Sequence, residues 1–160
     1  MEILDVVNDF DEVIGQAPRS EVYKRHLNHR IVHVLIFNQK GEMLLQLRSK
    51  HKPFLPGYWS TSVGGCVLAG ESYEQAAMRE MNEELGIKLE LKLSRQYSYP
   101  DPRGFKMMTC LFIAKSEGPF KPNPEEVERL EFVSIEKISL EEKLHPELKL
   151  ILSQGFSSSP

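Results

Sequence analysis

The feature that most constrains this chain is the stretch from Ser72 to Gly86, which carries a start signal, helix-forming residues and a stop signal. Ser72 and Gln75 have the spacing of a capping box, in which each side chain bonds the backbone N–H of the other residue. Residues 76–85 are mostly strong helix formers, and Gly86 is the residue type that commonly ends a helix. The sequence therefore predicts a helix that begins after Ser72 and ends at Leu85.

Three glutamates fall along one side of this predicted helix. At about 100° per residue, Glu83 lies about 40° from Arg79, Glu80 about 100° and Glu84 about 140°. The adjoining arc, from about 160° to 260°, is apolar and consists of Ala77, Met78, Met81 and Leu85. The acids therefore line one edge of the face that packs on the core.

Carboxylates at this spacing repel each other by a few tenths of a kcal/mol per pair, and a cation between them removes the conflict. Oxygen ligands of this kind suit Mg²⁺ or Mn²⁺, and Mg²⁺ binds substrate phosphates through one or two carboxylates. A solvated acidic face is the alternative explanation, and the glycines that flank the segment favour the metal site. We expect Mg²⁺, with Mn²⁺ as a substitute, and a phosphate ester as its ligand.

The whole string from Gly65 to Ile87 resembles the Nudix box, Gly-x5-Glu-x7-Arg-Glu-U-x-Glu-Glu-x-Gly-U, in which U is bulky and apolar. Every fixed position is met, and the chance of such a match is on the order of 10⁻⁸ per starting position. The resemblance implies an α/β (α+β) fold, an α/β/α sandwich around a mixed sheet. It also implies hydrolysis of the diphosphate bond in a nucleoside diphosphate linked to another moiety, or in a similar compound.

The same resemblance assigns roles to individual residues. Glu80, Glu83 and Glu84 would bind the divalent ion, with the carbonyl of Gly65 as a further ligand. One of Glu80 or Glu83 would activate water, and the choice stays open. Arg79 and Glu71 would form a bracing pair. Glu131 would be an auxiliary metal ligand or base, and an exposed acid on a strand is an equally good interpretation of it.

A second resemblance, to type 1 isopentenyl diphosphate isomerase, runs from Asn38 to Glu71 and makes Arg48 and Lys52 candidates for gripping the diphosphate. However, Gly64 stands where the isomerase has its catalytic cysteine, and Cys66 stands where it has a metal-binding histidine. We therefore expect an isomerase-like Nudix hydrolase without isomerase chemistry. An isomerase-like enzyme and a non-catalytic nucleotide-binding domain remain the alternatives.

Length and composition bound the remaining expectations. The 160 residues favour one domain over residues 1–155, followed by a flexible tail over 156–160. A net charge of -3 argues against coating nucleic acid, and no apolar run is long enough for a membrane span. The only two cysteines, Cys66 and Cys110, indicate neither a disulfide framework nor a structural zinc site, so we expect a cytoplasmic protein. The partner expected is a small-molecule diphosphate, and a homodimer is compatible with the sequence.

Apolar patterns and turn residues predict the other elements. The stretch from Pro53 to Gly70 is expected to be an irregular loop, because it is rich in glycine and proline. Strands are expected over 3–7, 31–37, 43–47, 87–97, 106–115 and 131–134, and helices over 21–26 with Ser20 as cap, 135–144 and 146–153.

Overall fold

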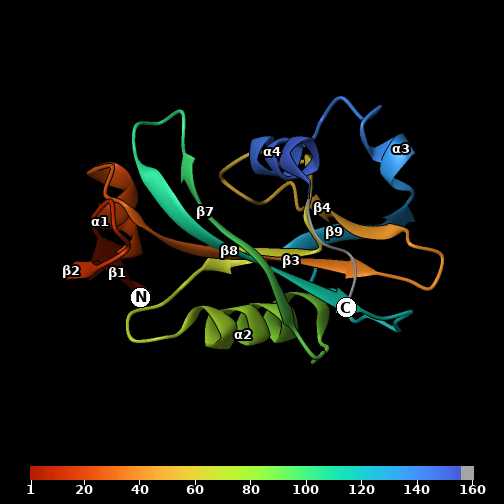
Figure 1. The fold of residues 1–160 in the computed structure, drawn as a ribbon, viewed down its shortest axis with the longest axis horizontal. Coiled ribbons are helices and arrows are strands. Elements are labelled where there is room, and N and C mark those ends of the chain that lie inside the picture. The colour runs from red at the N-terminus through yellow and green to blue at the C-terminus, as the bar shows by residue number, and fades with distance from the viewer. Residues whose placement is uncertain (156–160) are drawn as a thin grey trace.

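A mixed β-sheet with helices on both faces makes up the fold of the computed structural model, which describes residues 1–155 (Figure 1). The predicted tail over 156–160 lies outside the described residues. Nine strands are described: β1 (Ile3–Val7), β2 (Val13–Pro18), β3 (His29–Phe37), β4 (Met43–Arg48), β5 (Trp59–Ser60), β6 (Val63–Cys66), β7 (Lys92–Pro100), β8 (Lys106–Lys115) and β9 (Val127–Val133). The helices of the same part of the chain are α1 (Arg19–Lys24), α2 (Tyr73–Leu85), α3 (Ile135–Ile138) and α4 (Pro146–Gln154).

Strand β3 is the centre of the sheet. It runs parallel to β8, from His29 opposite Met107 to Phe37 opposite Lys115, and antiparallel to β6 over Ile31 to Val34. The remaining strand pairs are antiparallel. Both faces of β3 are covered, which explains why its sequence is an almost continuous apolar run.

Two apolar cores lie on opposite faces of the sheet, because successive side chains of a strand point to opposite sides. Val32, Val34 and Ile36 of β3 pack with α2. Leu35 and Phe37 pack on the other side, with α3 and α4. Figure 1 shows α2 beneath the sheet and both C-terminal helices above it. The predicted α/β/α sandwich is confirmed.

Helix α2 has the predicted bounds and the predicted signals. The Ser72 side chain accepts from the Gln75 N–H, and the Gln75 side chain accepts from the Ser72 N–H. The helix ends at Gly86, whose φ of 62° is left-handed. The acids of this helix are therefore held by a locally encoded element.

Several boundaries differ from the sequence prediction. The expected irregular loop contains strands β5 and β6, because the Val63–Cys66 backbone is paired with β3 despite its two glycines. Strand β2 pairs with β1 although it contains Gly15 and ends at Pro18. The other shifts move the start of β7 to Lys92, the start of β9 to Val127, the end of α3 to Ile138 and α1 to 19–24, where Ser20 is not the cap. None of the described helices is long and apolar enough to cross a membrane.

Candidate active site

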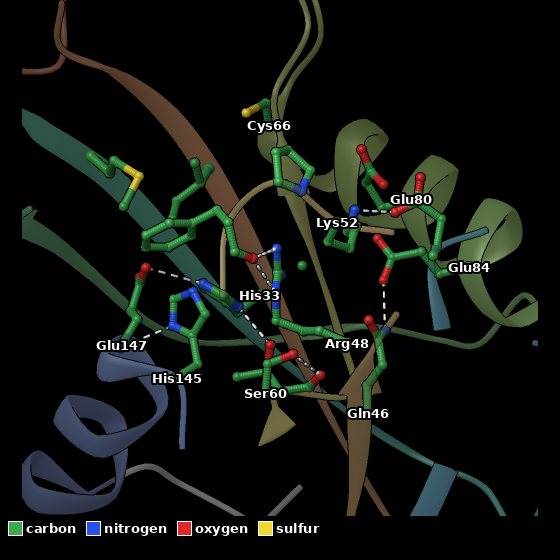
Figure 2. A pocket seen from close by; sticks show the side chains of 18 of the residues that line it. His33, Gln46, Arg48, Lys52, Ser60, Cys66, Glu80, Glu84, His145 and Glu147 are labelled. Carbon is green, nitrogen blue, oxygen red and sulfur yellow. Dashed lines mark hydrogen bonds and ion pairs between the residues drawn. The ribbon is translucent and has the colours of Figure 1, made fainter. Parts of the chain in front are cut away.

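A cavity of about 660 Å³ lies between the start of α4 and the acidic edge of α2. Glu80 and Glu84 line it on one side, and His33, His145 and Glu147 line it on the other (Figure 2). Its lining includes most of the residues that the sequence singled out: Arg48, Lys52, Gly65, Glu80, Glu83 and Glu84.

The three glutamates along the acidic edge of α2, Glu80, Glu83 and Glu84, are buried in the order that the helical wheel predicts. The Glu83 side chain is 53% exposed, Glu80 is largely buried with its side chain 13% exposed, and Glu84 is only 4% exposed. Glu84 Oε1 accepts a hydrogen bond of 2.8 Å from Gln46 Nε2 on β4. The amide of Gln46 in turn donates to the carbonyl of Ser62 at 2.9 Å, so Glu84 has a fixed orientation.

Glu80 and Glu84 each affect the ionisation of the other. Burial raises the pKa of the Glu84 carboxyl well above its ordinary value, and the neighbouring Glu80 raises it further, while the Gln46 amide opposes the shift. Burial also raises the pKa of Glu80, against the opposing hydrogen bonds of Glu84 and Arg79. Two buried carboxyls in contact cannot both ionise without a nearby positive charge.

Gly65 allows the Glu80 carboxyl to lie against the backbone of β6. A Cβ at position 65 would lie 2.3 Å from Glu80 Cδ and 2.4 Å from its Oε1. Only glycine permits this approach, and it leaves the peptide of residue 65 next to the carboxyl.

Arg79 and Glu71 form the bracing pair that the resemblance implies. The Arg79 guanidinium donates to both Glu71 oxygens at 2.8 and 2.9 Å and to the Cys66 carbonyl at 3.0 Å. Its remaining contacts are with Glu80 at 2.8 Å and Glu83 at 3.3 Å. Burial opposes the ionised form of Glu71, but Arg79 and the Leu68 N–H outweigh it and lower the pKa of Glu71. This pair ties α2 to the end of β6.

The donor set at this point fits a small divalent cation. Within residues 1–155, no three carboxylate, imidazole or thiolate groups converge on one point, and Glu83 is bonded to Arg79 at the helix surface. However, Glu80 and Glu84 meet beside the bare backbone of Gly65. One or two carboxylates are what Mg²⁺ takes from proteins when water and phosphate oxygens supply its other ligands.

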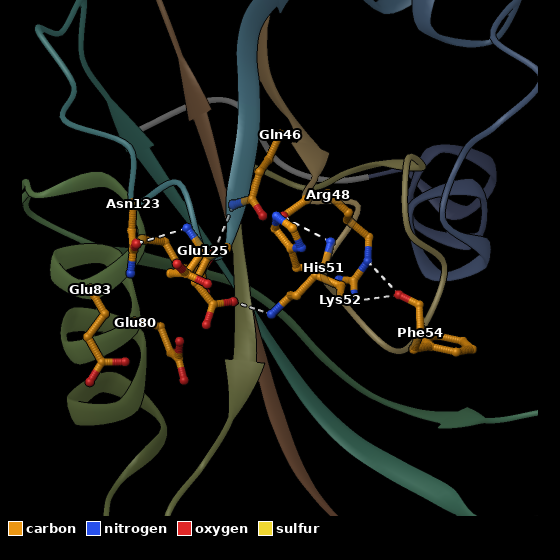
Figure 3. A network of polar contacts seen from close by, with 12 residues as sticks. Gln46, Arg48, His51, Lys52, Phe54, Glu80, Glu83, Asn123 and Glu125 are labelled. Carbon is orange, nitrogen blue, oxygen red and sulfur yellow. Dashed lines mark hydrogen bonds and ion pairs between the residues drawn. The ribbon is translucent and has the colours of Figure 1, made fainter.

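Arg48 and Lys52 both reach the cavity, but each has a protein partner (Figure 3). Arg48 donates to the Phe54 carbonyl through Nε at 3.0 Å and Nη2 at 2.7 Å. Burial lowers its pKa, and none of the ion pairs found in the described residues includes it. Lys52 forms an ion pair with Glu126.

Glu131 lies away from the other candidates. It pairs with Leu45 in the sheet, and Leu45 faces the α3 and α4 core, whereas Gln46 faces Glu84. The alternation of β9 therefore turns the Glu131 side chain, which is 54% exposed, to the opposite face from α2. The acid that the cavity does receive from this region is Glu126, the residue just before β9.

Sequence reasoning missed several polar residues of the cavity wall. Gln46 and His33 lie inside apolar strands, and a single polar residue in such a run is the signal that would have found them. His145 and Glu147 flank Pro146 at the start of α4. An acidic residue is common in the first turn of any helix, so Glu147 gives no signal of a site. Their convergence with His33 is visible only in the folded chain.

A comparison with known families gives this site its context. The sequence profile of the NUDIX domain matches residues 27–154. The chain belongs to the Nudix family. Nudix hydrolases act on phosphoric anhydride bonds, and the relatives of this chain place it among such enzymes.

Two similarities illustrate the extent of the match. An uncharacterized Nudix hydrolase of Pseudomonas aeruginosa is 36% identical over 141 residues, which cover 88% of this chain and 83% of the relative. The crystal structure of DR0079 from Deinococcus radiodurans superposes with a TM-score of 0.83 at 28% identity, covering 96% of this chain and 98% of that one. A more distant fold match, at 18% identity and a TM-score of 0.62, is the NUDIX domain of Shewanella oneidensis NrtR complexed with ADP ribose, covering 86% of this chain and 96% of that one.

Proposed function

We propose that this Nudix hydrolase is Mg²⁺-dependent and cleaves the diphosphate bond of a nucleoside diphosphate linked to another moiety, or of a similar compound. The observation that carries the proposal is the buried Glu80–Glu84 pair against the bare backbone of Gly65. Mn²⁺ fits the same oxygen ligands.

Each residue of the site has a task in this proposal. Glu80 and Glu84 hold the cation, with the Gly65 carbonyl beside them as a further ligand, and Gln46 and Arg79 orient the two carboxylates. The cation, when bound, neutralises charge that develops on the diphosphate. Glu83 lines the cavity and is the most exposed of the three acids, so it is the first candidate for taking a proton from water. Glu80 is the second candidate.

The basic residues of the 48–54 region supply the anion-binding side of the cavity. Arg48 keeps its charge next to the cavity while its Nε and Nη2 are held by the Phe54 carbonyl. Lys52 would exchange Glu126 for a substrate phosphate, because a phosphate offers a stronger charge to the same ammonium. A cavity of about 660 Å³ has room for a ligand larger than a bare diphosphate. The ADP ribose bound by the NrtR domain has this chemistry.

Isomerase chemistry receives no support from the site. A Cβ at Gly64 would lie 2.9 Å from His33 Nδ1, so the His33 ring fills the space that a cysteine side chain would need. The two cysteines are free and buried, which accords with the cytoplasmic location that we propose. A homodimer remains part of the proposal without a defined interface.

Charge-neutral substitutions test the proposal directly. Glu83→Gln and Glu84→Gln should each lower kcat at least about a hundredfold on Mg²⁺-loaded enzyme, because each removes a charge that acts on the reacting groups. Release of phosphate or nucleotide from a panel of diphosphate compounds is the measurement, and isopentenyl diphosphate is included to detect isomerisation. Glu74→Gln is the matched control, since Glu74 is an exposed acid of the same helix. Unchanged turnover in both variants would contradict the roles proposed for Glu83 and Glu84.

A further inference from the structure

A histidine at the start of α4, His145, lines the cavity wall opposite the acids of α2 (Figure 2). One nitrogen of its ring caps the helix, since Nδ1 accepts a hydrogen bond of 3.1 Å from the Glu147 N–H. A backbone N–H can only donate, so Nδ1 carries no proton. The one proton of the neutral ring is therefore on Nε2, and this nitrogen is a hydrogen-bond donor.

The Nε2 donor of His145 is unpaired but accessible. It makes no hydrogen bond within residues 1–155. Among these residues, the buried side-chain atoms without a hydrogen bond are His33 Nε2 and Glu147 Oε1, which face each other as an ion pair at 3.2 Å. His145 Nε2 is not one of them, so it is not sealed from solvent, and the residue lines the cavity. A ligand acceptor in the cavity can therefore reach it.

Arg48, on β4, presents a second donor of the same kind. Its Nε and Nη2 donate to the Phe54 carbonyl at 3.0 and 2.7 Å. Its Nη1 has no hydrogen-bond partner in the described part of the chain, and it too is absent from the sealed atoms. Each of the two side chains is therefore held by one edge and offers its other edge to the cavity. Donors held in this way lose little freedom when a ligand binds.

Phe54 keeps the two donors near each other. Its carbonyl holds Arg48, and its ring packs edge-on against the His145 ring, with the centroids 5.8 Å apart. The Arg103 guanidinium lies 4.0 Å from the centroid of the Phe54 ring and is itself held by Asp101 at 2.8 Å. Phe54 is thus fixed from several sides, so the donors are in place before a ligand enters.

Arg48 also relates His145 to the metal-binding acids. Burial lowers the pKa of Arg48, and the charge of Glu84 opposes this shift. Burial and His33 lower the pKa of His145, and the charge of Arg48 adds to the effect. Because such effects fall with distance, Arg48 lies close to both residues, and Figure 2 shows it between them. A diphosphate that extends from a cation at Glu84 past Arg48 would reach the His145 donor.

We propose that His145 is a substrate-binding residue whose Nε2–H, together with Arg48 Nη1, binds phosphate oxygens of the diphosphate on the side away from the metal. A phosphate offers several acceptor oxygens, and its charge complements that of Arg48. A carbonyl or ether oxygen would satisfy His145 but would leave the Arg48 charge unpaired in the cavity. The Glu147 carboxylate does not oppose the phosphate, because it is paired with His33. This inference rests on the proposed function and adds to it a phosphate contact from α4.

Two substitutions separate the cap from the substrate contact, because Asn and Gln each replace one nitrogen of the histidine ring. In His145→Asn, the side-chain oxygen takes the place of Nδ1 as the cap, but no atom reaches the position of Nε2. In His145→Gln, the amide N–H reaches close to the position of Nε2, but Gln is not a good cap. A purely structural role and a substrate contact therefore predict opposite results for the two variants.

His145→Asn should raise KM for the best substrate of the diphosphate panel at least about tenfold, because a hydrogen bond to a charged group is lost. Its kcat should change less than about threefold, since the contact is present in both the ground state and the transition state. His145→Gln should keep KM within about threefold of the wild type and should lower Tm. His26→Asn is the control, because His26 is exposed, lies outside the cavity lining and has a left-handed φ of 54° that Asn tolerates.

Calorimetric titration with inorganic pyrophosphate in the presence of Mg²⁺ applies the same test without turnover. The Kd should rise in His145→Asn by a factor similar to that of KM and should stay near the wild-type value in His145→Gln. A wild-type Kd in His145→Asn would overturn the inference, as would equal losses of binding in both variants or a wild-type chain that binds no pyrophosphate.

The two measurements also distinguish this inference from the proposed function. A raised Kd in His145→Asn, without hydrolysis of any compound by the wild type, would contradict the proposed function alone. Hydrolysis by the wild type, with an unchanged KM in His145→Asn, would contradict this inference alone. A raised KM with an unchanged Kd for pyrophosphate would show that His145 contacts another part of the substrate, and would overturn the phosphate contact.

Discussion

Two adjacent glycines on β6 make room for side chains on opposite sides of the strand. Gly64 leaves room for the His33 ring and Gly65 leaves room for the Glu80 carboxyl. The two glycines face opposite sides of one strand, so this dipeptide contacts His33 on one side and Glu80 on the other. Neither glycine has a positive φ, so the close approach of neighbouring side chains, not backbone conformation, requires glycine at each position.

At the residue scale, Gly65→Ala should disable the site while leaving the fold in place. The new Cβ would overlap Glu80, whose carboxyl must move away from the backbone of residue 65. We expect kcat/KM to fall by about a hundredfold, because an acid displaced from its working position loses most of its effect. Steady-state kinetics with Mg²⁺ is the measurement. Gly15→Ala has nothing within 4 Å of the new Cβ and is the matched control; similar activity in the two variants would contradict the role of Gly65.

At the element scale, the two helices that bound the cavity are stabilised differently. Helix α2 carries a complete capping box and a glycine stop. Helix α4 begins with Pro146, and its cap is the imidazole of His145, whose Nδ1 accepts from the Glu147 N–H at 3.1 Å. Accepting this bond requires a neutral ring, so the start of α4 depends on the protonation of His145.

This cap makes stability depend on pH. Burial, with a further contribution from His33, lowers the pKa of His145 to about 3 in the folded chain. The unfolded chain then binds more protons than the folded one between the ordinary histidine value of about 6.5 and about 3, so stability falls as the pH falls through this window. The slope from this one group is up to about 1.4 kcal/mol per pH unit.

His145→Asn should reduce that slope, since Asn is a good cap that does not titrate. Urea unfolding between pH 7.5 and 4.5 is the measurement. Part of the slope should remain, because burial also lowers the pKa of His29. An unchanged slope would show that His145 does not exclude a proton in the folded state.

At the scale of the whole molecule, the cavity exists because α2 and α4 approach the sheet from opposite faces near the same strands. Helix α2 brings the acids, α4 brings His145 and Glu147, and β3, β4 and β6 bring the residues between them. The acids of α2 repel each other when no cation is present, so the fold itself should respond to a divalent ion.

Adding Mg²⁺ should therefore raise the Tm of the wild-type chain, because a ligand that binds only the folded state stabilises it. Glu84→Gln should show little or no increase with Mg²⁺. Without Mg²⁺ its Tm should equal or exceed that of the wild type, since an amide replaces a buried carboxyl whose pKa is raised. Scanning calorimetry with and without Mg²⁺ is the measurement, with Glu74→Gln as control. An equal Mg²⁺ response in Glu84→Gln would remove Glu84 from the ligand set.

The sequence by itself determined the elements whose signals are local. The bounds of α2, its caps and the graded burial of Glu80, Glu83 and Glu84 follow from a period of 3.6 residues and from capping chemistry. The apolar runs of β3 and β8 are recognisable for the same reason. The position of the acidic edge of α2 is therefore encoded within about fifteen consecutive residues, which is the span of one capped helix.

Tertiary structure alone decided which distant residues meet. Val63–Cys66 is a strand because β3 pairs with it, and Glu131 faces away from α2 because its register with Leu45 sets the side. His33 and Glu147 are brought together by the packing of α4 on the sheet. Such contacts depend on pairing partners and on the face of a sheet, and a one-residue change of register reverses that face. The residues adjacent in the chain do not determine which strand pairs with which, or which face of the sheet a side chain takes.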